Sequence, residues 1–148
     1  MKVELRIFNF VDYLRFLLLT LNKESSKELD NNFWGYLFKG LRSLFKKNRD
    51  YKFAILADGK FAGSAALSYT KEGYEIGYFV LKKYRGKGIA TKAARDVLNF
   101  GFKELRLRKV LALTDTDNKS SNKILAKTGF KKIRENKKER EFLWKKRR

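Results

Sequence analysis

The segment Tyr84–Thr91 constrains the fold of this chain most strongly, because it places two glycines between a predicted strand and a predicted helix. Gly86 and Gly88 allow the backbone to adopt positive φ and to come close to a ligand. A helix that begins directly after them presents unpaired N–H groups and the positive end of its dipole. The turn is therefore a predicted anion site that fits a pyrophosphate. Further positive charge comes from Lys82, Lys83, Arg85 and Lys87.

Hydrophobic spacing sets the order of the elements around this turn. Alternating apolar residues predict strands, apolar stripes at helical spacing predict amphipathic helices, and Asp58-Gly59-Lys60 is a hairpin turn signal. Hairpins and strand–helix–strand units both occur, so we predict an α+β protein with a mixed sheet. Residues 1–148 are expected to form a single domain, with a short basic C-terminal end within residues 142–148. The expected strands are Lys2–Phe8, Tyr51–Ala57, Phe61–Ser68, Tyr74–Leu81, Lys109–Leu113, Phe130–Arg134 and Glu141–Trp144; the expected helices are Asp12–Leu21, Phe33–Phe45, Gly86–Arg106 and Ser120–Lys127, with Gly129 as a helix C-cap.

Composition narrows the chemistry that the chain can perform. The sequence contains no cysteine and no histidine, which removes thiolate chemistry, the usual zinc ligands and the histidine of a Ser-His-Asp triad. Carboxylates, hydroxyls and water must carry any proton transfer. The apolar run Phe16–Leu19 is too short for a signal-peptide core or a membrane span, so we expect a cytoplasmic protein without a membrane partner.

Three nucleotide-binding motifs compete for the glycines of this chain. Gly35 and Gly40 have P-loop spacing, but Leu41 and Arg42 follow where Lys and Ser/Thr are needed. A dinucleotide fingerprint would need glycine where Thr91 stands, within a parallel strand–helix–strand unit near the N-terminus. The pattern Arg/Gln-x-x-Gly-x-Gly/Ala is matched in full by Arg85, Gly88 and Ala90.

With this motif and two others, the sequence resembles the GNAT family of N-acetyltransferases. Glu75–Val80 is similar to the family's fourth strand, Tyr84–Ala90 to its pyrophosphate loop, and Asn118–Phe130 to its Asn-x-x-Ser…Lys-x-Gly-Phe stretch. The resemblance is greatest to the branch that acetylates ribosomal-protein N-termini. It implies the GNAT acyl-CoA N-acyltransferase fold, a mixed and mostly antiparallel sheet flanked by helices. It also implies acetyl-CoA as co-substrate and no metal.

The resemblance also implies which residues bind the co-substrate. The fourth strand would pair through its backbone with the pantetheine arm, and Asn118 and Ser121 would contact that arm with their side chains. Two structural interpretations stay open: Ile76, Tyr78 and Val80 alternate like the core face of any strand, and Asn118 suits a helix N-cap. The expected co-substrate contacts are Phe79, Val80, Leu81, Arg85, Gly86, Lys87, Gly88, Ile89, Ala90, Thr91, Asn118 and Ser121.

Two residues are candidates for proton transfer. Glu75 matches a position that is a catalytic glutamate in several family members; the alternative is a surface residue paired with a lysine. Family members with a tyrosine acid carry it where this chain has Leu125, so the resemblance leaves that role empty. Ser121, one helical turn earlier on the same face, is the nearest replacement.

The implied function is transfer of acetyl from acetyl-CoA to a primary amine, by direct attack because no cysteine offers a covalent relay. The alternative is a catalytically inactive GNAT-fold module that binds RNA or the ribosome. The formal net charge of +20 is consistent with binding to an acidic partner. It is equally consistent with a source whose proteins use lysine frequently at polar positions. It disfavours polyamine acceptors unless an acidic patch intervenes, so a protein N-terminus is the favoured acceptor. We expect such a patch to come from Asp12, Glu24, Glu28, Asp30 and Glu75.

Overall fold

The structure is a computed structural model that describes residues 1–9, 11–12, 14–15, 18 and 49–145. Of the first expected helix, Asp12–Leu21, the described residues 12, 14, 15 and 18 are helical, and so is residue 11. The second expected helix, Phe33–Phe45, lies outside the described residues.

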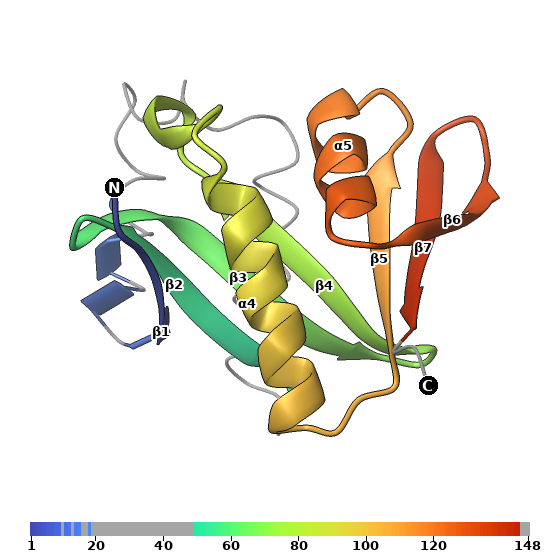
Figure 1. The fold of residues 1–148 in the computed structure, drawn as a ribbon, viewed down its shortest axis with the longest axis horizontal. Coiled ribbons are helices and arrows are strands. Elements are labelled where there is room, and N and C mark those ends of the chain that lie inside the picture. The colour runs from blue at the N-terminus through green and yellow to red at the C-terminus, as the bar shows by residue number, and fades with distance from the viewer. Residues whose placement is uncertain (10, 13, 16–17, 19–48, 146–148) are drawn as a thin grey trace.

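A seven-stranded sheet forms the centre of the molecule, in the order β1-β2-β3-β4-β5-β7-β6 (Figure 1). The β4–β5 pair is parallel, and the other pairs are antiparallel. This confirms the predicted mixed, mostly antiparallel sheet. The elements are β1 Val3–Ile7, β2 Tyr51–Ala57, β3 Lys60–Thr70, β4 Gly73–Val80, the 3-10 turn η1 Lys82–Tyr84, α4 Ile89–Lys103, β5 Lys109–Asp115, α5 Lys119–Lys127, β6 Lys131–Glu135 and β7 Glu139–Lys145.

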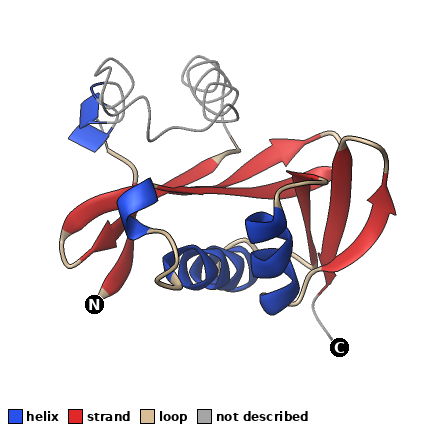
Figure 2. Cartoon of the chain, turned by 90° about the horizontal axis from the view of Figure 1, so that it is seen from above, coloured by secondary structure: helices blue, strands red, loops and turns tan. Residues whose placement is uncertain are grey.

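Both α4 and α5 lie on one face of this sheet (Figure 2). The chain needs α4 as a crossover, because parallel neighbours such as β4 and β5 cannot be joined by a tight turn. The face of α4 that meets the sheet carries small and aliphatic residues, which lets the helix lie close to the strands. Its buried residues are Ile89, Ala93, Ala94, Val97, Leu98 and Gly101.

Helix α4 is shorter than predicted at both ends. The glycine-rich segment from Gly86 stays outside the helix, because Gly88 has φ 76° and caps a helix that starts at Ile89. The last regular residue is Lys103, and Arg106 has φ 53°, which no α-helix allows. The end of α5 follows the prediction: Gly129 has φ 91°, and the Phe130 N–H donates to the Leu125 carbonyl as in a Schellman cap.

Asp12 has a structural role that corrects its expected place in an acidic surface patch. Its side chain is fully buried, and its carboxylate accepts a hydrogen bond from Arg6 Nη2 at 2.7 Å. The Asn9 N–H donates to the same carboxylate at 2.9 Å, and the Asp12 N–H donates back to Asn9 Oδ1 at 3.0 Å. This reciprocal cap fixes the start of the helical segment to β1, and Asp12 itself contributes no acidic surface.

Gly63 allows β3 to lie close to the end of β4. It pairs with Val80, and a Cβ added to it would overlap the Phe79 carbonyl oxygen and lie 3.0 Å from the Val80 Cα. Both contacts are with backbone, which cannot move aside as a side chain can.

We therefore expect Gly63→Ala to destabilise the protein by about 1–3 kcal/mol, the usual range for overpacking. Urea unfolding measures this as a lower midpoint. The matched control is Ser64→Ala, at a neighbouring position that already has a Cβ. Equal midpoints for the two variants would contradict the close approach at Gly63.

Candidate active site

The loop between β4 and α4 has the geometry of an anion site. Gly86 and Gly88 both have φ 76°, and a Cβ on either would meet no atom within 4 Å among the described residues. The first hydrogen bond of α4 joins the Lys92 N–H to the Gly88 carbonyl at 3.0 Å, so the N–H groups of the preceding turn have no partner within the helix. Within the part of the chain that the structure describes, no side chain caps this end.

The charged residues of the loop are exposed, but they do not all face outward as isolated cations. Arg85 folds back, and its Nε donates to the Val80 carbonyl at 2.9 Å while its guanidinium lies 5.9 Å from the centre of the Phe79 ring. Lys87 Nζ lies 5.9 Å from the centre of the Tyr84 ring. Arg85 therefore ties the loop to the end of β4 as well as adding charge. Ile89 has its side chain in the core, 1% exposed, so any ligand contact it makes is through its backbone.

The strands β4 and β5 separate next to this loop. They pair in parallel at Glu75 opposite Leu111, and toward the C-terminal end of β4 they diverge (Figure 1). The Leu81 N–H donates to the Ala62 carbonyl on β3 at 2.9 Å, so this N–H is not a group that would pair with an added strand. Along a strand, the N–H and C=O groups of successive residues point alternately to its two sides. Because the Leu81 N–H points toward β3, the backbone groups of Val80 and Tyr78 point toward β5. Of the expected contacts Phe79, Val80 and Leu81, Val80 has its backbone on the diverging edge.

Helix α5 brings two hydroxyl groups together at this divergence. Asn118 caps the helix by accepting the Ser121 N–H at 3.0 Å, which confirms the N-cap interpretation of this residue. Ser121 Oγ lies 2.9 Å from the Tyr78 hydroxyl, and both residues are half-buried. Leu125 is 1% exposed and belongs to the core.

The pairing of Tyr78 with Ser121 was not predicted from the sequence. Alternation placed Tyr78 on the same face of β4 as the buried Ile76 and Val80, and it was therefore interpreted as a core residue. That face is also the one covered by α4 and α5 (Figure 2). Nothing in the residue pattern sets the distance between two hydroxyls that lie 43 positions apart.

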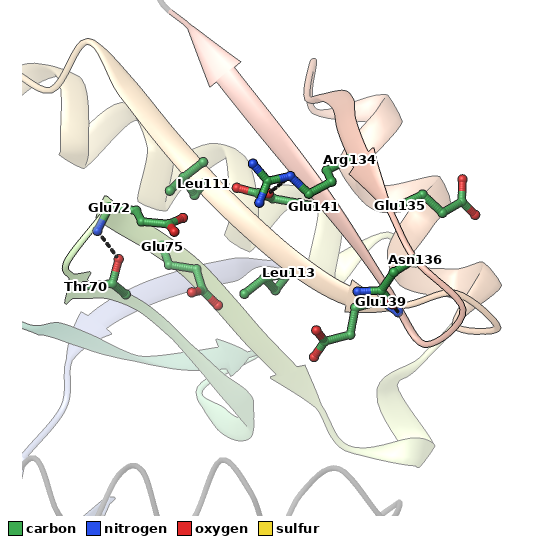
Figure 3. A pocket seen from close by; sticks show the side chains of 10 residues that line it. All are labelled: Thr70, Glu72, Glu75, Leu111, Leu113, Arg134, Glu135, Asn136, Glu139 and Glu141. Atoms are coloured by element: carbon green, nitrogen blue, oxygen red, sulfur yellow. Dashed lines mark hydrogen bonds and ion pairs between the residues drawn. The ribbon is translucent and has the colours of Figure 1, made fainter.

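A pocket of about 200 Å³ lies on the opposite face of the sheet (Figure 3). Glu75 lines it, because its side chain alternates with those of Ile76 and Tyr78. Five carboxylates and a single arginine lie around it, in a chain whose formal net charge is +20. The lining residues are Thr70, Glu72, Glu75, Leu111, Leu113, Arg134, Glu135, Asn136, Glu139 and Glu141.

Glu135 and Glu141 lie beside cationic side chains of the protein. Hydrogen bonds from Lys132, the larger cause, and from Arg140 lower the pKa of the Glu135 carboxyl group. Glu141 Oε2 lies 3.7 Å from Arg134 Nε. The pocket is thus an acidic region, but its members differ from the patch expected from the sequence. Glu75 is the member common to both; Glu24, Glu28 and Asp30 lie outside the described residues.

Within the described ranges, no group of three or more histidine, cysteine, aspartate or glutamate side chains is arranged so that it could hold a metal ion. The same ranges contain no helix with the length and apolar character needed to cross a bilayer.

Comparison with known proteins agrees with this architecture. The family described as Acetyltransferase (GNAT) domain matches residues 15–131, and the chain therefore belongs to the GNAT family. The putative ribosomal N-acetyltransferase YdaF of Bacillus subtilis is 33% identical over 79 residues, which cover 51% of this chain and 43% of the relative. The spermidine N(1)-acetyltransferase of Escherichia coli K12 is 30% identical over 100 residues, which cover 63% and 54%.

Among solved structures, Mycobacterium smegmatis RimJ in complex with CoA-disulfide superposes with a TM-score of 0.76 at 23% identity. The alignment covers 97% of this chain and 81% of that one. This similarity supports the GNAT fold. The chain spans about half the length of the curated relatives it matches.

Proposed function

We propose that the protein transfers an acetyl group from acetyl-CoA to a primary amine. The observation that carries this is the open turn at Gly86 and Gly88, which leads directly into the divergence of β4 and β5. A pyrophosphate would accept hydrogen bonds from the N–H groups of the first turn of α4, where the helix dipole favours an anion. The first turn of α4 contains no acidic residue to oppose it.

The remainder of the co-substrate would follow the diverging strands. Acetyl-CoA supplies the acetyl thioester. The backbone of Val80 would align the pantetheine arm, and Asn118 and Ser121, at the start of α5, would lie on the other side of that arm. Phe79 and Leu81 then support this edge through β3.

The two proposed proton transfers take place on opposite faces of the sheet. Glu75, in the acidic pocket, is the proposed base for the attacking amine. Ser121, in the first turn of α5 on the other face, is the proposed acid for the departing thiolate. The amine attacks the thioester directly, because the sequence offers no cysteine to carry the acetyl group.

For the acceptor we propose a protein or peptide N-terminal amine. A net charge of +20 repels polycations at long range, whereas an N-terminus brings little further charge. The similarity to a putative ribosomal N-acetyltransferase supports this choice, and a basic surface suits a substrate presented on an RNA-rich particle. Such a protein would act in the cytoplasm.

The pocket favours a second candidate, a cationic amine such as a short polyamine. Its five carboxylates provide the local acidic region that a polycation would need to approach this chain. A volume of about 200 Å³ has room for an aliphatic amine chain, and one curated relative is a spermidine N(1)-acetyltransferase.

A competition assay decides between these acceptors. We expect an N-terminal peptide amine to be acetylated faster than spermidine when both are present at low salt, with release of free CoA as the measurement. Faster acetylation of spermidine would overturn the N-terminal preference and support the second candidate. CoA binding without turnover on a panel of N-terminal, lysine, polyamine and aminoglycoside amines would instead favour an inactive RNA- or ribosome-binding module.

A further inference from the structure

We propose that Tyr78 and Ser121 form a two-hydroxyl relay, in which Ser121 protonates the departing CoA thiolate and Tyr78 replaces the proton on Ser121. The proposal rests on the acetyltransferase function proposed above. It adds to that function the source of the proton that the leaving thiolate needs.

The relay depends on a contact that holds both hydroxyls in place. The Tyr78 hydroxyl lies 2.9 Å from Ser121 Oγ and 3.5 Å from the Ser121 carbonyl oxygen. Ser121 is positioned in turn by its N–H, which donates to Asn118 Oδ1 at 3.0 Å. Tyr78 packs against the core from β4, so the phenol is directed at the start of α5 by both packing and hydrogen bonding.

The position of the pair matches the place where a thiolate would form. Tyr78 lies on β4 beyond the Glu75–Leu111 pair, where β4 and β5 diverge, and Ser121 lies in the first turn of α5. Glu75 has its side chain on the opposite face, in the acidic pocket. The amine would therefore lose its proton on one face of the sheet, and the sulfur would gain one on the other.

Acid strength explains why serine needs the tyrosine. An ordinary thiol has a pKa of about 8.5 and a phenol of about 10, whereas a serine hydroxyl does not titrate in the range where proteins are folded. A serine that gave up its proton alone would be left as a strongly basic alkoxide. Concerted transfer from the phenol avoids that state, because the charge ends on the phenolate instead.

The relay balances the overall reaction. The amine nitrogen forms a bond to the acetyl carbon, the carbon–sulfur bond breaks, and the electron pair of that bond goes to sulfur. Sulfur takes the Ser121 proton, Ser121 takes the Tyr78 proton, and the phenolate is reprotonated by water. The proton that the amine loses to Glu75 returns to solvent, so the products are the acetylated amine and CoA.

The test compares Tyr78→Phe with Tyr51→Phe. Both replacements delete a hydroxyl from a half-buried strand tyrosine that packs against the core, but Tyr51 lies on β2 and packs against Phe100. We expect Tyr78→Phe to lower kcat by about tenfold, no more than Ser121→Ala does, with the KM for acetyl-CoA within about twofold. Tyr51→Phe is expected to retain the wild-type kcat. The double variant Tyr78→Phe with Ser121→Ala is expected to be no slower than the slower single variant, because the two act as one unit.

The pH profile separates a relay from a tether that merely holds α5 against β4. Because the relay needs a protonated phenol, kcat should fall as pH rises through the pKa of Tyr78. Site-specific replacement of Tyr78 by a fluorinated tyrosine, whose phenol is more acidic, should move this alkaline limb to lower pH. A limb that does not move, with kcat retained, would overturn the relay and leave the proposed function intact. Absence of turnover in the wild-type protein on every acceptor would overturn both.

Discussion

Replacing Gly88 with glutamate is expected to weaken acetyl-CoA binding by at least about 100-fold, equivalent to about 2.7 kcal/mol. The added Cβ itself meets no atom within 4 Å among the described residues, so the loss would not come from a clash within the protein. It would come from a carboxylate that occupies the proposed pyrophosphate site and repels its charge at close range. Isothermal titration calorimetry with acetyl-CoA measures the change.

A second glycine provides the control for backbone strain. Gly59 has φ 74° in the β2–β3 hairpin, and its Cβ position is equally open among the described residues. Gly59→Glu therefore has the same conformational cost, about 1–2 kcal/mol for a non-glycine residue in the left-handed region, but lies outside the proposed site. We expect it to lower stability as Gly88→Glu does while acetyl-CoA binds normally.

Lys87→Ala tests how much of the affinity comes from side-chain charge. Lys87 is exposed, and the pyrophosphate would be held chiefly by backbone N–H groups, so we expect less than about a tenfold loss. Undiminished binding in Gly88→Glu would mean that the co-substrate site lies elsewhere. A larger loss in Lys87→Ala than in Gly88→Glu would mean that charge, rather than the turn, makes the site.

The glycine-rich turn could be located from the sequence because its physical cause is local. Positive φ at Gly86 and Gly88 is a property of single residues, and the strand before them and the helix after them show their own periodicity. The same holds for the N-cap at Asn118 and the Schellman end at Gly129, which depend on contacts within a few residues. These parts of the fold were predicted at nearly the observed positions.

Features that join distant segments could not be derived in this way. The Tyr78–Ser121 contact and the acidic pocket each depend on how far β4 and β5 diverge and where the β6–β7 hairpin turns back. The expected acidic patch comprised Asp12, Glu24, Glu28, Asp30 and Glu75, and the structure buries Asp12 against Arg6. Sequence shows that a carboxylate is present, whereas tertiary packing decides whether it faces a pocket or a buried arginine.

The largest effect on chemistry is expected from Glu75→Gln, which should lower kcat by about 10²- to 10⁴-fold with little change in acetyl-CoA affinity. Glutamine keeps the size of the side chain in the pocket but cannot accept a proton from the attacking amine. Steady-state kinetics with the best acceptor gives kcat, and calorimetry gives the affinity for acetyl-CoA. Ser121→Ala should lower kcat less, by about tenfold, because water can replace a hydroxyl group as proton donor.

The matched control for Glu75 is Glu72→Gln, which removes the same charge from the same pocket. Glu72 lies in the turn between β3 and β4, where its N–H donates to Thr70 Oγ1 at 3.2 Å, and Glu75 lies where β4 meets β5. If the pocket acts only through its charge, both variants should raise the KM of a cationic acceptor and keep kcat. If Glu75 is the base, Glu75→Gln should lower kcat and Glu72→Gln should not. The position of Glu75 beside the diverging strands would then matter as well as its charge. Unchanged rates in both Glu75→Gln and Ser121→Ala would exclude the two proposed proton routes and leave backbone groups and water to carry them.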